Sequence, residues 1–597
     1  MSKLFVLDPS LNDVGGHHYD YDFHVVCAAE QLGYQTILAT HHTFAHQHTL
    51  PDSCQVLPLF RYHTYNRYSE LAGIRSLQAD ERKSKETSRS IVPFLSRFPR
   101  AVSNWLDRRK VANPIRGRSR RSQRFAQDCV KLFNEFRIED GDHVFLPTVS
   151  ELDLLGLAQY LRETPKTRSI DWHVQFHFNL FEGREPDYLA QVGQLAGVRR
   201  QLLKAIGQIS HHKVHFYTTS EPLARQYNLL GVAEFESLAY PVNPRFQTEV
   251  SGRLDDGPLR ITCAGVPRHE KGQAHICDIV REMWRDYFDT GDVQLVIQSK
   301  PWDFQFGQEL PWPKPGRHRH EPMTNQPVVY IDHPLQIEQY ADLVQRADIG
   351  LLMYDSQRYY ARRAGVLGEM LTAGVPVVVP AGCWLSEQIA EPIFQHVEQQ
   401  AKQLRLKGQV TLGNTEFGDD AHRHECSVDI PEGATEMTVE FNWRPPTPAG
   451  IYVRLLCDRI SSADGTTDSF ETIIGQRDSN RPSAALIHLK PNTRLVRITW
   501  SNAYGDDLIQ IRDASVRFLS NCETTAESCP AGQVGLIAAN EKQVPELLDD
   551  MIRHYEHYRH TAEASSRDWF ERHDPRRTVS QLIEKEITVQ SIGQRAA

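Results

Sequence analysis

The feature that most constrains the fold is a series of short, continuous apolar runs that alternate with helical stretches in the second half of the chain. Five of these runs read as buried strands, at 259–265, 293–298, 328–332, 349–354 and 375–380. Strands that are apolar on both faces are typical of parallel sheets, because the crossover helices cover the sheet on both sides. The pattern therefore predicts a doubly wound α/β domain, preceded by the polar, glycine-bearing linker SGRLDDGPLR.

The N-terminal part of the chain shows the same alternation. An apolar run at 3–7 is followed by a glycine loop, a helically spaced apolar face from Phe23 to Leu32, and a second apolar run at 34–40. Further strands are expected at 143–147, 172–178 and 214–219. We predict two Rossmann-like domains in tandem, the first at 1–245 and the second at 255–400 plus 530–597.

The pattern changes between about 405 and 520, where apolar residues recur at every second position in some seven short segments separated by turn residues. This spacing predicts an antiparallel β-sandwich inserted into the second α/β domain. After the insertion, an apolar run at 532–540 and an amphipathic helix at about 541–570 continue that domain. The aromatic residues Trp443, Trp500 and Tyr504 lie in the insertion, and they form either a sugar-stacking platform, as in a carbohydrate-binding module, or the sandwich core.

Charge excludes one broad class of function. The 597-residue chain carries a net charge of −9, which argues against a general nucleic-acid binder because such proteins need a positive surface. One segment departs from this balance, since residues 80–124 hold fourteen Lys or Arg and four Asp or Glu. This basic insertion, at about 60–125, also carries apolar side chains between Phe94 and Leu106. It suits either contact with an anionic membrane surface or a charged loop over an acceptor cleft.

Localisation follows from what the sequence lacks. No apolar run reaches the roughly 18 residues needed to span a membrane, and the run before Asp8 is too short for a signal-peptide core. The ten cysteines show no zinc-finger spacing, and the closest pair, Cys522 and Cys529, is expected to stay reduced. We expect a cytoplasmic protein, at most peripheral at the inner face of the membrane.

Two strand-to-helix loops carry candidate ligand-binding groups. Gly15 and Gly16 follow the first strand, where backbone amides and the helix N-terminus can approach a phosphate or a sugar; a tight turn is the alternative. The loop GVPRHEKGQ at 265–273 occupies the corresponding place in the second domain. Arg268 and Lys271 in this loop would neutralise a leaving diphosphate, unless the loop is merely a solvated charged segment.

A third candidate segment is YDSQRYYARRAGVLGEMLTAGVPVVVP at 354–380. Gly365 is expected to begin a helix whose N-terminal amides can hold a phosphate, with Arg362 and Arg363 beside it. Glu369 lies one turn into this helix and could accept hydrogen bonds from ribose hydroxyls. The alternative for Glu369 is a surface carboxylate paired with a neighbouring arginine.

Taken together, these segments resemble the GT-B glycosyltransferases, in particular the group 1 family of retaining nucleotide-sugar transferases. The motifs that carry the resemblance are the GG loop, TTSEPLARQY at 218–227, LAYPVNPRF at 238–246, ITCAGVPRHEKG, and YADLVQRADIGLLMYD followed by GVLGEMLTAGVPVVVPAG. The resemblance covers about 1–58, 127–395 and 530–590.

The resemblance implies roles for individual residues. A nucleotide-sugar donor would place its diphosphate at Arg268 and Lys271, a phosphate at the amides of Gly365 and Val366, and its ribose at Glu369. His177, in WHVQFHF at 172–178, would face the donor sugar and the acceptor; a packed strand histidine is the alternative.

Two positions depart from the family pattern. Ala361 stands where members usually carry a glutamate that contacts the donor sugar, and Val266 stands at the usual arginine of the first loop. Arg268 is the candidate substitute for that arginine. These departures leave open a non-catalytic glycan-binding or scaffold protein, and the same fold also serves sugar-nucleotide epimerases.

The implied reaction is transfer of a sugar, with retention, to a hydroxyl of a glycan or a lipid-linked glycan. The leaving diphosphate would help to deprotonate that hydroxyl, and fixed cations would replace a metal ion. Asp20 and Asp22 form a D-x-D sequence that resembles a metal-binding motif. However, this sequence lies on an expected helix, where the two side chains point apart. We therefore predict no metal site.

Overall fold

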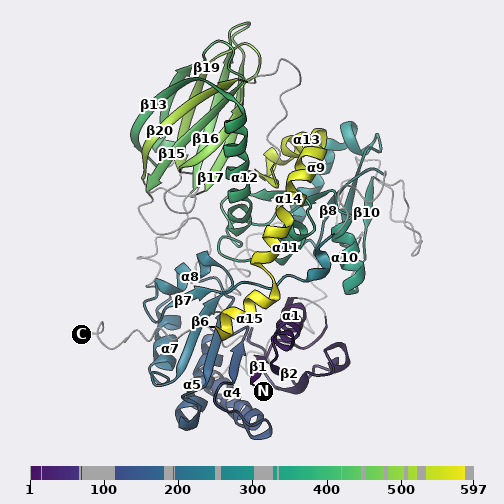
Figure 1. Cartoon of the computed structure of the whole chain (residues 1–597), viewed down its shortest axis with the longest axis vertical. Coiled ribbons are helices and arrows are strands. Elements are labelled where there is room, and N and C mark those ends of the chain that lie inside the picture. The colour runs from purple at the N-terminus through teal and green to yellow at the C-terminus, as the bar shows by residue number, and fades with distance from the viewer. Residues whose placement is uncertain are drawn as a thin grey trace, which may run out of the picture. The chain divides into compact units, whose positions relative to one another are not determined.

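The structure is a computed structural model of the chain (Figure 1). It describes residues 2–14, 17–65, 69, 71, 114–180, 193, 195–248, 257–300, 327–332, 335–418, 420–444, 452–475, 482–502, 508–520, 533–538 and 540–584. The chain divides into two compact units. Unit 1 comprises Met1–Phe181, Asp187–Pro241 and His573–Ala597, and unit 2 comprises Glu182–Pro186 and Val242–Arg572.

Unit 1 contains a seven-stranded parallel sheet in the order β3-β2-β1-β4-β5-β6-β7. The strands are β1 (Lys3–Asp8), β2 (Gln35–His41), β3 (Gln55–Phe60), β4 (His143–Leu146), β5 (Asp171–Phe176), β6 (Lys213–Thr218) and β7 (Phe235–Ser237). The direction of winding reverses between β1 and β4. In open α/β sheets, ligands bind beyond the carboxyl ends of the strands at such a switch point.

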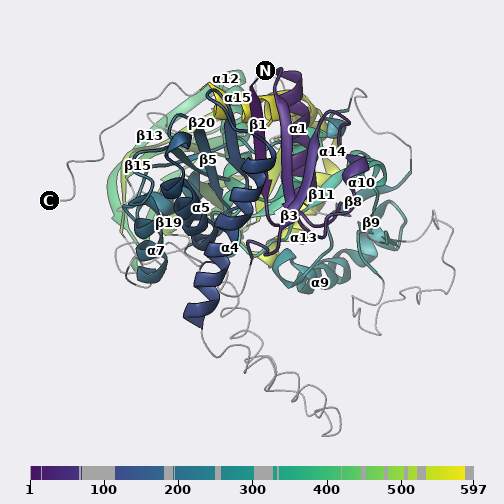
Figure 2. The ribbon, with the colours of Figure 1, turned by 90° about the horizontal axis from the view of Figure 1, so that it is seen from below.

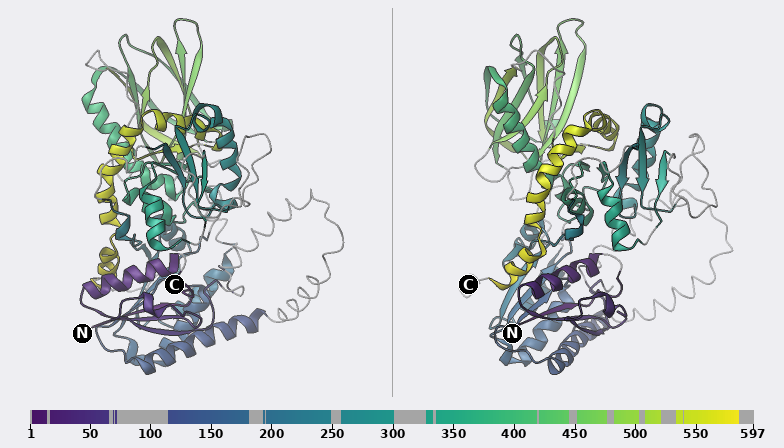
Figure 3. Two further views of the ribbon diagram at one scale, coloured as in Figure 1. Left: turned by 90° about the vertical axis from the view of Figure 1, so that its right-hand side faces the viewer. Right: turned by 45° about the vertical axis from the view of Figure 1, so that its right-hand side comes forward.

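Helices cover both faces of this sheet. They are α1 (His17–Gln31), α4 (Pro114–Glu135), α5 (Glu151–Glu163), α7 (Ala196–Ile206), α8 (Glu221–Asn228) and α15 (Pro575–Ile583), with short 3-10 turns at Gln47–Thr49 and Pro165–Thr167. Helices α4, α5 and α7 pack side by side on one face (Figure 2). Helices α1 and α15 share a core with β1 and β2 on the other face (Figure 3). Strand β1 serves both cores, because Phe5 contacts Phe133 of α4 while Leu4 and Val6 point the opposite way.

Unit 2 contains a second parallel sheet in the order β10-β9-β8-β11-β12-β21, which reverses between β8 and β11. Its strands are β8 (Leu259–Cys263), β9 (Val293–Ile297), β10 (Val328–Tyr330), β11 (Ile349–Leu351), β12 (Val377–Pro380) and β21 (Gly535–Ala538). Its helices are α9 (Gln273–Met283), which continues as a π-helical turn at Trp284–Phe288, α10 (Ile337–Gln345), α11 (Gly365–Thr372), α12 (Trp384–Gln403), α13 (Val544–Arg553) and α14 (Tyr555–Arg572). Short 3-10 turns lie at Pro244–Phe246, His269–Lys271 and Glu541–Gln543.

Between α12 and β21 the chain forms two antiparallel four-stranded sheets, ordered β13-β20-β15-β18 and β14-β19-β16-β17 (Figure 1). The strands are β13 (Arg405–Phe417), β14 (His424–Asp429), β15 (Glu436–Arg444), β16 (Tyr452–Ser461), β17 (Thr467–Gly475), β18 (Ser483–His488), β19 (Thr493–Asn502) and β20 (Ile509–Ser520), with a 3-10 turn at Asp420–His422 between the first two. Sequence periodicity missed β13, because most of its side chains are exposed and its apolar residues do not alternate.

Trp443 and Trp500 lie in the shared core of the two antiparallel sheets, and Trp500 is only 1% exposed. The sugar-stacking platform is therefore wrong for these two residues, because a ring that packs between sheets offers no face to a ligand. Tyr504 lies outside the described residues.

The expected single helix at 541–570 is also wrong in detail. Helix α13 ends at Arg553 and α14 begins at Tyr555, because His554 between them adopts a non-helical backbone (φ −119°, ψ 30°). Helix α15, two residues after α14, belongs to unit 1.

The predicted fold class is confirmed by the sheets themselves: two parallel α/β sheets, with an antiparallel β-sandwich in the C-terminal half. Among the described residues, no helix combines the length and apolar character that crossing a bilayer requires.

Candidate functional site

The loop that follows β8 lies at the switch point of the unit 2 sheet. Gly265 adopts a left-handed conformation (φ +72°), and its N–H donates to Oε1 of Gln298 at 2.6 Å. A Cβ atom at Gly265 would lie 3.0 Å from Nζ of Lys271 and 3.0 Å from Cγ2 of Val366. Glycine therefore permits the close approach of two predicted site residues that are 95 positions apart in the sequence.

Lys271 ends a 3-10 turn, and the residue that follows it, Gly272, fits only as glycine. Gly272 has φ +77°, and a Cβ there would lie 2.2 Å from the carbonyl oxygen of Met353, just beyond β11. The backbones of the two loops are thus in contact at this point. Arg268, at the start of the same turn, is exposed.

Lys271 is held in an environment that disfavours its charge. Its Nζ lies 5.3 Å from the ring centroid of Tyr354. Burial, and then the positive charge of Arg268, lower the pKa of Lys271 to about 8, whereas Glu369 acts in the opposite direction. The hydroxyl of Tyr354 is buried and has no hydrogen-bond partner among the described residues. A cation with a lowered pKa beside an unsatisfied hydroxyl is the kind of environment found at ligand sites.

Glu369 lies on α11 and folds back over the first turn of that helix. Its Oε2 accepts a hydrogen bond from the hydroxyl of Tyr340 at 2.6 Å, and its Oε1 is 3.6 Å from where a Cβ of Gly365 would be. The N-cap residue Ala364 has no side chain that could cap the first-turn amides of α11. The amides of Gly365 and Val366 therefore lie at a helix N-terminus close to both Lys271 and Glu369.

Tyr340 is a site residue that the sequence analysis did not single out. It lies on α10, in the YADLVQRAD segment, and its ring packs edge-on against Phe246 at 5.9 Å. The segment carries part of the family resemblance, but nothing in its spacing indicates that the tyrosine hydroxyl reaches a carboxylate 29 residues later.

The two arginines before α11 occupy different environments. The guanidinium of Arg362 lies 5.2 Å from the ring centroid of Tyr359. Arg363 is buried, with its guanidinium 5.4 Å from the ring centroid of Trp384. Ala361 is fully buried, and its methyl side chain offers no carboxylate at this position of the loop.

A further pair of contacts ties this segment to the β8 loop. The N–H of Asp355 donates to the carbonyl oxygen of Glu270 at 3.0 Å, and Arg358 forms an ion pair with Glu270 at 3.5 Å. The loops that carry Lys271 and Arg362 are therefore linked through backbone and side chains alike.

In unit 1, His177 comes directly after β5, at the carboxyl end of the sheet. Its Nε2 is 3.4 Å from Oε1 of Gln175, and its ring lies edge-on to Tyr21 at 6.2 Å. It is half-buried, unlike the fully buried strand residue His173. Gly15 and Gly16 lie outside the described residues, as does most of the basic insertion, at 72–113.

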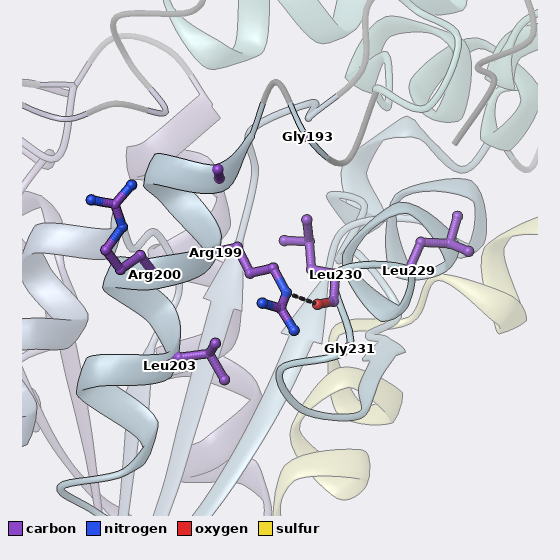
Figure 4. Close-up of a pocket in the computed structure, with 8 residues that line it drawn as sticks. Gly193, Arg199, Arg200, Leu203, Leu229, Leu230 and Gly231 are labelled. Carbon is purple, nitrogen blue, oxygen red and sulfur yellow. Dashed lines mark hydrogen bonds between the residues drawn. The ribbon is translucent and has the colours of Figure 1, made fainter. Parts of the chain in front are cut away.

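The part of the chain that the structure describes contains no group of three or more His, Cys, Asp or Glu side chains that could hold a metal ion. A surface hollow of about 620 Å³ occurs in unit 1 between α7 and the end of α8 (Figure 4). Arg199 crosses it and donates from Nε to the carbonyl oxygen of Leu230 at 2.8 Å. None of the predicted site residues lines this hollow.

No family model matches the sequence, and no curated protein sequence matches it. Solved structures resemble it in fold at 11–12% sequence identity. An α,α-trehalose-phosphate synthase (UDP-forming) from Burkholderia xenovorans, in complex with glucose-6-phosphate, gives a TM-score of 0.42 at 11% identity, over 65% of this chain and 88% of that chain. An E. coli trehalose-6-phosphate synthase bound with UDP-2-fluoro glucose gives 0.40 at 11% identity, over 65% and 86%.

A sucrose-phosphate synthase from Thermosynechococcus elongatus gives a TM-score of 0.37 at 12% identity, over 66% of this chain and 85% of that chain. Structural similarity at this level gives no information about the activity of this chain. The class of the chain therefore rests on its own two parallel sheets and on the residues at their switch points.

Proposed function

We propose that this protein is a glycosyltransferase that moves a sugar from a nucleoside-diphosphate sugar to a hydroxyl of a glycan or lipid-linked glycan. The observation that carries the proposal is the cluster at the switch point of unit 2. Lys271, the α11 N-terminus and Glu369 meet there through the space that Gly265 leaves open. Such a cluster offers a cation and helix amides to a diphosphate, and a carboxylate to a neighbouring hydroxyl.

Each group in the cluster has a distinct proposed task. Lys271 and Arg268 neutralise the charge that develops on the leaving diphosphate, which lowers the barrier to breaking the bond between the sugar and the phosphate. The amides of Gly365 and Val366 cap one phosphate. Glu369, held by Tyr340, accepts hydrogen bonds from the ribose. His177 is proposed to face the sugar and the acceptor, and the proposed outcome is retention of the anomeric configuration.

Nucleotide binding tests the proposal most directly. Thermal unfolding of the full chain would be measured with UDP, GDP, ADP, TDP and CMP, each at a series of concentrations. A nucleotide at 100 times its dissociation constant stabilises the native state by about 2.7 kcal/mol. One nucleotide should stand out, and Lys271→Ala should abolish its effect.

A matched variant distinguishes the loss of a nucleotide-binding lysine from the general effect of removing any lysine. Lys402 is exposed on the last turn of α12 in the same unit, and Lys402→Ala should respond to the nucleotide as the wild-type protein does. Release of nucleoside diphosphate from the corresponding sugar nucleotide, lost in Glu369→Ala and Lys271→Ala, would then establish turnover. A panel without any stabilising nucleotide would overturn the proposal.

The second candidate is a non-catalytic glycan-binding or scaffold protein, and the observation that favours it is the buried Ala361. No carboxylate is available at this position to contact a donor sugar. This alternative predicts that a nucleotide binds but no sugar nucleotide is turned over.

A further inference from the structure

The ammonium group of Lys271 has an aromatic neighbour but no polar partner. Within the part of the chain that the structure describes, its Nζ takes part in no hydrogen bond and no ion pair. It lies instead over the ring of Tyr354, 5.3 Å from the ring centroid. A cation within about 6 Å of a ring centroid is attracted to the negative face of the π-system. The Tyr354 ring therefore stabilises the charged form of Lys271 at short range.

The other influences on this ammonium group nearly all oppose its charge. Burial, and then the positive charge of Arg268, lower the pKa of Lys271 to about 8. Arg362 acts in the same direction, whereas Glu369 and Glu270 favour the charged form without pairing with the lysine. A buried cation with two positive neighbours needs a stabilising contact, because desolvation and like charges both favour the neutral amine.

The ring that provides this contact is held firmly. Tyr354 lies just beyond β11, is 4% exposed and belongs to an apolar core of unit 2. Its N–H donates to the carbonyl oxygen of Leu352 at 2.8 Å, and its ring packs 4.7 Å from that of Tyr359, centroid to centroid. Close packing leaves a core ring little freedom, whereas a lysine side chain is flexible. The rigid partner in this contact is therefore the tyrosine.

The hydroxyl of Tyr354 does not provide the stabilisation. It is buried without a hydrogen-bond partner among the described residues. Burial, and then the neighbouring Tyr359, raise the pKa of Tyr354 well above its usual value, so the phenol stays neutral and cannot act as a counter-anion. Removing the hydroxyl therefore breaks no described hydrogen bond and leaves the ring in place, which makes the ring and the hydroxyl separable by substitution.

We propose that Tyr354 is a positioning residue for Lys271, whose ammonium group it holds charged and in place, through the face of its ring, until a diphosphate oxygen becomes the partner. The inference rests on the proposed function, in which Lys271 contacts the diphosphate of the donor. A lysine that is fixed before the ligand arrives loses less side-chain freedom on binding. The ring thereby also sets the upper end of the pH range in which the diphosphate binds.

The first measurement is the titration of Lys271 in the unliganded full chain, followed by NMR of protein labelled with ¹³C at lysine Cε. The resonance of Lys271 is the one that Lys271→Arg removes. Tyr354→Phe keeps the ring and should titrate near pH 8, as the wild-type protein does. Tyr354→Leu and Tyr354→Met remove the π-system and should lower the pKa of Lys271 by about one unit. Two non-aromatic variants are used because they fill the space differently.

The second measurement is the affinity of the full chain for UDP, GDP, ADP and TDP by titration calorimetry between pH 6 and 9. A pKa lowered by one unit reduces the charged fraction of Lys271 by about fivefold at pH 8 and hardly at all at pH 6. Tyr354→Leu should therefore lose about fivefold in affinity at pH 8 and almost none at pH 6. Tyr354→Phe should follow the wild-type profile. In a Lys271→Arg background, Tyr354→Leu should produce no pH-dependent loss, because the guanidinium stays charged.

A matched control makes the same substitution elsewhere in unit 2. Tyr287 is partly buried in the π-helical turn after α9, and its hydroxyl donates to Asp549. Tyr287→Leu should leave the titration of Lys271 and the affinity profile unchanged. A role of Tyr354 in packing alone would instead lower the affinity by the same factor at every pH, and that result would overturn the proposal.

The failures of the two proposals are distinguishable. If a nucleoside diphosphate binds through Lys271 but neither non-aromatic variant changes the titration, the assignment of Tyr354 is overturned and the proposed function stands. The assignment is also overturned if Tyr354→Phe behaves as Tyr354→Leu does. If no nucleoside diphosphate binds to the wild-type protein, the proposed function falls, and the role of Tyr354 in diphosphate binding falls with it.

Discussion

The lowered pKa of Lys271 leads to a quantitative prediction about nucleotide binding. Burial and the nearby Arg268 bring this pKa from 10.5 to about 8. Such a change corresponds to a penalty on the order of 3 kcal/mol for the charged form relative to a solvated lysine. A bound diphosphate would offset part of that penalty, because it adds negative charge beside Lys271 to that of Glu369.

The charge state of Lys271 determines how the affinity for a nucleoside diphosphate should change with pH. With a pKa of about 8, Lys271 is mostly charged at pH 7 and mostly neutral at pH 9. If only the charged form binds the diphosphate, affinity should fall by about tenfold between these two pH values. A phosphate group has its own titration near pH 6, so the ligand keeps its charge over this range.

The assay is isothermal titration of the stabilising nucleoside diphosphate at pH 7, 8 and 9. Lys271→Arg supplies a cation that stays charged throughout the range, so its affinity should be nearly constant with pH. Lys271→Met should bind weakly at every pH. Equal wild-type affinity at pH 7 and 9, or the same loss of affinity in Lys271→Arg, would refute the assignment of Lys271 to the diphosphate.

Three further substitutions test separate parts of the structure. Gly272→Ala places a Cβ 2.2 Å from the carbonyl oxygen of Met353 at a left-handed φ, and should destabilise the protein by more than about 2 kcal/mol in denaturant unfolding. Tyr340→Phe removes a donor to Glu369; the preference for a ribonucleotide over its 2′-deoxy form should fall by about fivefold in titration calorimetry, and an unchanged preference would exclude a role of this hydrogen bond in ribose recognition. Trp500→Ala empties part of the sandwich core and should cost about 3–5 kcal/mol of stability, measured by chemical unfolding, whereas an exposed platform residue would cost almost nothing.

Much of the candidate site was accessible from the sequence because its residues lie at recognisable places in strand-to-helix units. Lys271 and Gly365 follow strands that are evident from their apolar runs, and parallel strands bring their carboxyl ends to one edge of a sheet. Tyr340 was missed, because the contact that gives it a role joins its hydroxyl to a carboxylate on a different element. The hydrophobic periodicity of a single helix or strand does not indicate a contact between side chains of two different elements.

The sequence by itself determined the two parallel sheets and the antiparallel insertion, because hydrophobic periodicity is a local property that each segment carries with it. Only the tertiary structure decided which side chains are buried and what surrounds them. Trp500 became core rather than surface, Lys271 acquired a lowered pKa, and Asp22 was enclosed beside Asp8. The physical reason is that desolvation and charge interactions depend on atoms from segments far apart in the chain, which meet only after the strands have assembled into sheets.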